Sequence, residues 1–85
     1  MSDDGRQVWL VYREYTDKGL VTAVYATPDG EYKHLEQLSA NSPRTITAAK
    51  EVGEHRLEEA DSEERDRYAE EVARMADRHD PDDPV

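Results

Sequence analysis

The sequence predicts an α+β fold, in which a three-stranded antiparallel β-meander is followed by two α-helices. Two observations predict it. Residues 7–39 alternate runs of β-branched and aromatic residues with two turn sequences that end in glycine. Residues 42–79 instead carry apolar residues at intervals of three and four, which is the spacing of one face of a helix. A chain of 85 residues allows one domain over residues 7–79, and the ends, 1–6 and the acidic 80–85, are expected to be disordered.

The meander is predicted from its turns as much as from its strands. The strands are expected at Gln7–Tyr15, Leu20–Ala26 and Glu31–Leu38. The sequences Thr16–Gly19 and Thr27–Gly30 join them, and each suits a type I turn followed by a glycine in the left-handed region. In such a hairpin Thr16 pairs with Leu20 and Thr27 pairs with Glu31, so the turns set the register of the sheet.

This register divides the side chains of the sheet between two faces. One face carries Val8, Leu10, Tyr12, Val24, Ala26, Tyr32 and His34. The other carries Trp9, Val11, Tyr15, Val21, Ala23, Tyr25 and Leu35. Both faces are largely apolar, whereas an antiparallel sheet with one solvated face would alternate cleanly between apolar and polar residues.

The helical half begins with Ser42 as a predicted N-cap and Pro43 in the first helical position. The apolar stripe of the first helix is Ile46, Ala49, Gly53, Leu57 and Ala60. Asp61, with Glu64 three residues later, resembles a capping box and predicts the start of a second helix, with the stripe Tyr68, Val72, Met75, Ala76 and His79. The two stripes are nearly in phase, so one long helix is the alternative. A helical hairpin is favoured because a lone three-stranded sheet needs cover.

The composition is unusually acidic. Aspartate and glutamate outnumber lysine and arginine by 21 to 11, which gives a net charge of -10, and cysteine is absent. The chain therefore has neither disulfides nor thiolate metal sites. Acid-rich, lysine-poor and low in bulky apolar residues, it resembles the proteins of salt-accumulating archaea. The resemblance lies in composition alone and implies adaptation to high salt, where charge repulsion is screened over about 3 Å at 1 M.

Two sequence features predict a cytoplasmic location. The longest apolar run, Val8–Tyr12, is far shorter than the ~20 residues of a membrane-spanning helix. The first five residues are acidic where a signal peptide would be basic and then apolar.

No residue pattern predicts catalysis. Glu51 and His55 are four residues apart on the predicted first helix, but a second histidine at metal-ligand spacing is missing, so a solvated face is the simpler interpretation. His34 is expected to be a hydrogen-bonded, half-buried histidine, although a pocket that joined it to a carboxylate would favour an enzyme. The chain has no phosphate-binding glycine motif and no paired nucleophile and base, so we expect no enzyme, no cofactor and no metal.

These observations predict a non-enzymatic protein-interaction module that forms a homodimer. The helices can cover only one of two apolar faces, and they are expected on the face of Trp9 and Ala23. The first strand would also leave an apolar edge unpaired, which proteins normally cover. The interface candidates are the residues of the uncovered face: Val8, Leu10, Tyr12, Val24, Tyr32 and His34.

The alternative hypothesis is a nucleic-acid-associated regulator. Its binding residues would be an aromatic and basic patch made of Trp9, Arg13, Tyr25 and Lys33. The net negative charge opposes phosphate binding, so nucleic acid is the weaker prediction. No membrane partner is expected.

Overall fold

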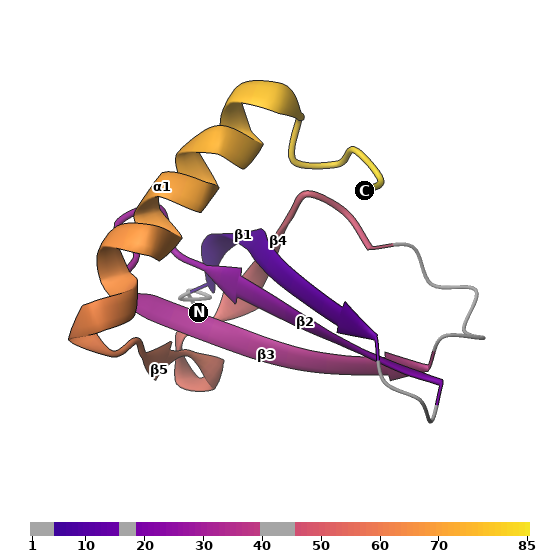
Figure 1. Cartoon of the computed structure of the whole chain (residues 1–85), viewed down its shortest axis with the longest axis horizontal. Coiled ribbons are helices and arrows are strands. Elements are labelled where there is room, and N and C mark those ends of the chain that lie inside the picture. Colours follow the sequence, from indigo (N-terminus) through magenta and orange to yellow (C-terminus); the bar gives the residue numbers. More distant parts are fainter. Residues whose placement is uncertain (1–4, 16–18, 40–45) are drawn as a thin grey trace.

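The computed structural model describes residues 5–15, 19–39 and 46–85, and within them it shows an antiparallel sheet crossed by one α-helix (Figure 1). The five strands lie in the order β4-β1-β2-β3-β5. They are β1 (Gly5–Tyr15), β2 (Leu20–Ala26), β3 (Tyr32–Ser39), β4 (Ala49–Gly53) and β5 (Glu58–Glu59). A 3-10 helix, η1 (Glu54–Arg56), precedes β5, and the α-helix α1 (Ser62–Arg78) follows it. The α+β class is confirmed, but the sheet has two more strands and one fewer helix than the sequence predicts.

The first predicted helix is wrong. Residues 49–53 form strand β4, which pairs with residues 5–9 of β1, so neither the helical hairpin nor the single long helix exists here. The physical reason is the apolar edge of β1, whose backbone groups gain partners from β4. The competing helix was weak, since its stripe held small residues and Gly53, which costs about 1 kcal/mol in a helix interior. Ser42 and Pro43 lie outside the described residues.

Helix α1 begins where the sequence predicts. Asp61 is its N-cap residue, and the backbone N–H of Glu64 donates to the Asp61 carbonyl over 2.8 Å. The side chain of Asp61 makes no capping hydrogen bond, so the capping box itself does not form. The helix buries Tyr68 and Val72 against the sheet.

A bulge in β1 changes which side chains share a face. The predicted pairing holds for Tyr12 with Val24, but between Leu10 and Tyr12 the register shifts by one residue. Because successive strand residues point to opposite faces, Leu10 now lies opposite Tyr25, and Trp9 lies opposite Ala26. The predicted grouping of Val8 and Leu10 with Val24 is therefore wrong.

The second turn is one residue longer than the sequence predicts. Ala26 pairs with Lys33, and the N–H of Thr27 donates to the Tyr32 carbonyl over 3.0 Å, which leaves residues 28–31 as the loop. Asp29 organises this loop, because its Oδ1 accepts from the Thr27 hydroxyl at 2.6 Å and from the Glu31 N–H at 3.0 Å. These bonds hold the pKa of Asp29 below its ordinary value, the Thr27 bond having the largest effect. The first turn lies outside the described residues except for Gly19.

The two shifts define two faces of the sheet, which we call the helix face and the far face. The helix face packs under α1, in a buried cluster of Trp9, Val24, Ala26, Ala48, Ala49, Ala60, Tyr68 and Val72. The far face has its own buried cluster of Val8, Leu10, Ala23, Tyr25 and Val52, with Ile46 and Leu57 packed against it. Long side chains also lie over the far face, since the Lys50 ammonium is 5.4 Å from the Tyr25 ring and the Arg6 guanidinium is 5.6 Å from the Tyr32 ring. Most of both apolar faces is thus covered within one chain.

The last six residues, for which the sequence predicts a disordered tail, form backbone hydrogen bonds with another segment. Their backbone runs beside residues 46–49: the N–H of Ala48 donates to the Asp83 carbonyl at 2.8 Å, and that of Val85 donates to the Ile46 carbonyl at 2.9 Å. Val85 also packs against both buried clusters. Proline stops the helix but suits an extended chain, so this segment pairs instead of fraying. Among the described residues, no helix combines the length and apolar content needed to cross a bilayer.

Candidate functional site

Three polar side chains meet on the far face, and they form the most organised polar cluster of the described chain. Glu36 on β3 accepts a short hydrogen bond from the ammonium of Lys50 on β4, although β1 and β2 separate these strands. His34 Nε2 lies 3.5 Å from the same Glu36 oxygen. Burial acts to raise the pKa of Glu36, but the hydrogen bond and charge of Lys50, with the contribution of His34, lower it overall. The carboxylate therefore stays ionised, and the cluster links β3 to β4.

An open cleft of about 570 Å³ lies beside this cluster. Four consecutive residues of β3, His34 to Gln37, line it together with Lys50, Arg56 and Glu58. Because the cleft touches these four residues and also Lys50, it runs along β3 and extends over the far face, where Lys50 reaches Glu36. The cleft joins His34 to the Glu36 carboxylate, which is the arrangement that would favour an enzyme, and its lining has no hydroxyl or thiol side chain. Its charged and polar side chains suit the binding of polar groups.

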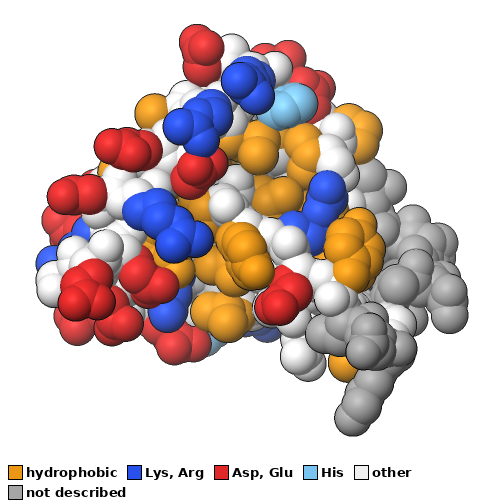
Figure 2. Space-filling model, in the orientation of Figure 1, with side chains coloured by type: hydrophobic (Ala, Val, Ile, Leu, Met, Phe, Trp, Pro, Cys, Tyr) orange, Lys and Arg blue, Asp and Glu red, His pale blue; other side chains and the backbone are white. Residues whose placement is uncertain are grey.

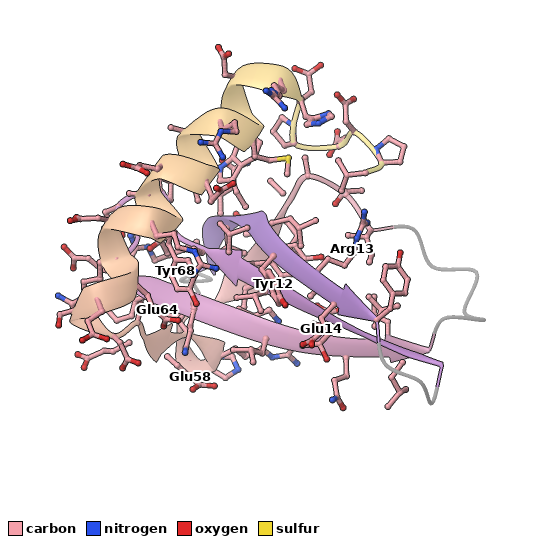
Figure 3. All side chains as sticks on the ribbon, in the orientation of Figure 1. Tyr12, Arg13, Glu14, Glu58, Glu64 and Tyr68 are labelled. Atoms are coloured by element: carbon pink, nitrogen blue, oxygen red, sulfur yellow. The ribbon has the colours of Figure 1, made fainter. Side chains whose placement is uncertain are left out.

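A second candidate surface lies on the helix face, where α1 does not cover the strands. Tyr12, Val24 and Leu35 sit at neighbouring register positions on β1, β2 and β3. Val24 is buried, but the Tyr12 and Leu35 side chains are 46% and 47% exposed. Figure 2 shows hydrophobic side chains gathered at the centre of this view, with charged groups around them. Figure 3 shows Tyr12 and Glu14 on the same side of β1.

The structure separates the six predicted interface residues. Val8, Leu10, Tyr32 and His34 belong to the far face, whereas Tyr12 and Val24 belong to the helix face. Val8, Leu10, Val24 and His34 are buried and Tyr32 is half-buried, so only Tyr12 is exposed. Sequence reasoning missed Leu35, which it placed under the helices. The signal that could have revealed Leu35 is Asp29, whose side chain supports a four-residue loop and so inverts the faces of β3.

The predicted nucleic-acid patch is not a connected surface. Trp9 is buried under α1, and Tyr25, with 2% of its surface exposed, is buried on the far face, so neither ring is available to stack on a base. Arg13 donates to the backbone oxygen of Val85 over 2.8 Å. Lys33 Nζ lies 3.8 Å from Glu64 Oε1 on α1. The structure therefore lacks the connected aromatic and basic patch on which the nucleic-acid hypothesis was based.

The residues considered as metal ligands do not form a site either. Glu51 lies in β4 and His55 in η1, instead of on one helix face. Within residues 5–15, 19–39 and 46–85, no group of three histidine or acidic side chains has the arrangement to hold a metal ion.

Comparison with known proteins places the chain in a family. A family model described as a family of unknown function, DUF7967, matches residues 1–85. The chain belongs to this family. The match includes both candidate surfaces, the cleft beside β3 and the exposed part of the helix face. Neither the curated proteins nor the solved structures include a match.

Proposed function

We propose that this protein is a small non-enzymatic interaction module of the cytoplasm, which forms a homodimer through the exposed part of its helix face. The single observation that carries the proposal is the pair Tyr12 and Leu35, two large apolar side chains that are each almost half exposed. They lie on either side of the buried Val24, so they form one continuous apolar surface. Such a surface on a small protein marks an interaction site.

Fewer features of the structure support a dimer than the sequence predicts. The two reasons drawn from the sequence were a second apolar face and an unpaired first strand. Within the chain, β4 pairs with the edge of β1, and the far face is buried under Leu57, Ile46 and long polar side chains. The Tyr12–Leu35 surface is the part that remains for a partner. A patch that contacts its own copy closes most simply with two-fold symmetry.

A groove beside Tyr12 supports a protein partner at this surface. It has a volume of about 200 Å³ and runs between β1 and the end of α1, with Val11, Met75 and Val85 in its lining. An apolar side chain from a second copy fits such a groove better than a polar ligand does. The charged groups Arg13 and Glu71 also line it, and they would remain at the polar rim of an interface.

The test compares two tyrosines of the same strand. Tyr12→Asp places a charge in the proposed interface, and Tyr15→Asp places it on a side chain that is 67% exposed and points to the other face. We expect light scattering in molar potassium chloride to show a dimer for the wild type and for Tyr15→Asp, and a monomer for Tyr12→Asp. Circular dichroism should show the same fold in all three proteins. A wild type that stays monomeric at high micromolar concentration would contradict the proposal.

Adaptation to concentrated salt is the second part of the proposal. Its support is the net charge of -10 on an 85-residue chain. At low ionic strength such a charge destabilises the compact state by self-repulsion. The stability of the protein should therefore rise with ionic strength, because salt screens this repulsion.

A further inference from the structure

The edge of β3 is the second surface of this protein that can accept a partner. On this edge β3 pairs with β5 at Tyr32 and Lys33 only, and no other described strand pairs with it there. Beyond Lys33 the cleft begins, and the edge of residues 34–37 forms one of its walls. A strand edge carries backbone N–H and C=O groups in the spacing that another extended chain needs, so it is a template for strand addition.

The opposite wall of the cleft provides positive charge. Arg56, in η1, is exposed and makes no ion pair with the described residues. Lys50, on β4, is already bound to Glu36, and this hydrogen bond connects β4 to the β3 wall of the cleft. Glu58, in β5, also lines the cleft with an exposed carboxylate, so a negatively charged ligand group must lie on the Arg56 side of the cleft, away from Glu58. The protein is strongly acidic, so an exposed guanidinium beside an unpaired strand edge is a local feature that can attract an acidic group.

We propose that this cleft binds an extended, acidic peptide segment of a partner protein. The segment adds to the edge of β3 through main-chain hydrogen bonds, and its carboxylate pairs with Arg56. This site differs in chemistry from the Tyr12–Leu35 dimer surface, because it binds its partner through backbone hydrogen bonds and charge, whereas the dimer surface is apolar.

The first experiment selects ligands from random seven-residue peptides displayed on phage, with the full chain as the target in molar potassium chloride. We expect the selected peptides to share β-branched residues in alternate positions and one aspartate or glutamate. Arg56→Gln should weaken their binding about tenfold, as expected for the loss of a charged hydrogen bond. The matched control is Arg78→Gln, which removes an exposed charge from the end of α1 and should leave the affinity unchanged. If no peptide is enriched, or if the enriched peptides lack the acid, the proposal is wrong.

The second experiment locates the bound peptide. In nitrogen-15 spectra of the full chain, the best selected peptide should shift the backbone amides of residues 36–38 and of Arg56. Three results would overturn the proposal: shifts confined to the surroundings of Tyr12 and Leu35, the same shifts with acetate alone, or shifts of residues 36–38 on concentrating the chain without peptide. The last would mean that a second copy occupies the edge. The two proposals fail separately, because the Tyr12→Asp variant should bind the peptide as tightly as the wild type does.

Discussion

At the residue scale, Gly30 shows how one position joins two elements. Its φ of +75° lies in the left-handed region, where glycine alone is unstrained. A Cβ at this position would also lie 2.2 Å from the backbone oxygen of Arg65 in α1, so the absence of a side chain lets the helix approach the loop. Gly19 has the same backbone conformation, with φ of +77°, but no atom of the other described residues lies within 4 Å of its would-be Cβ.

These two glycines give a matched test of the contact between the loop and α1. Gly19→Ala should cost about 1–2 kcal/mol of unfolding free energy, because it adds only left-handed strain. Gly30→Ala should cost a further 1–3 kcal/mol or so, since the new methyl group must displace the backbone of α1. Guanidinium denaturation of both variants in molar potassium chloride measures the difference. Equal losses would mean that α1 does not approach Gly30 this closely.

At the element scale, the strands that depend on local signals could be predicted from the sequence and those that depend on distant partners could not. β2 has the predicted ends, Leu20 and Ala26, because a turn sequence with glycine lies on each side. β4 has no such signal: its residues acquire strand structure only by pairing with β1, some forty positions earlier in the chain. Likewise, no local sequence signal predicts the bulge at Val11, and this bulge determines which face of the sheet carries Trp9.

The candidate sites follow the same division. Tyr12 was correctly expected on a face with Val24, because their pairing depends on the part of the register next to the first turn. The cluster of His34, Glu36 and Lys50 joins strands that are not neighbours in the sheet, so it could be found only after β4 was known. The terminal segment was missed for the same reason, since its hydrogen-bond partners are residues 46–49.

The terminal segment can be tested as a structural element. Val85→Asp should lower the unfolding free energy by about 1–3 kcal/mol, because it puts a charge among the buried clusters that Val85 contacts. Pro84→Asp is the control, since it adds the same charge at the preceding, exposed position. It should cost no more than the rigidity of proline, about 0.4–1 kcal/mol. Chemical denaturation compares the two variants, and equal effects would show that Val85 does not pack on the sheet.

At the scale of the whole molecule, a small apolar interior is enclosed by a surface with a large excess of negative charge. The two buried clusters are made mainly of alanine, valine and aromatic residues. The surface ion pairs include local ones, such as Arg74 with Glu71 on α1, and pairs between distant segments, such as Arg6 with Asp29; pairs this exposed contribute little to stability. The balance between a modest core and a charge of -10 therefore depends on the ionic strength of the solvent.

This balance predicts that the melting temperature rises steeply from low salt to molar potassium chloride, as the screening length falls from about 10 Å at 0.1 M to about 3 Å at 1 M. Salt also strengthens apolar burial, so a control must isolate the charge. A triple variant, Asp66→Asn with Glu70→Gln and Asp77→Asn, neutralises three exposed acids of α1 and changes the net charge from -10 to -7. We expect this variant to melt higher than the wild type in low salt and to gain less from added salt, while the two proteins converge at molar salt. Differential scanning calorimetry across the salt series measures both curves, and parallel curves would assign the salt effect to apolar burial instead of charge repulsion.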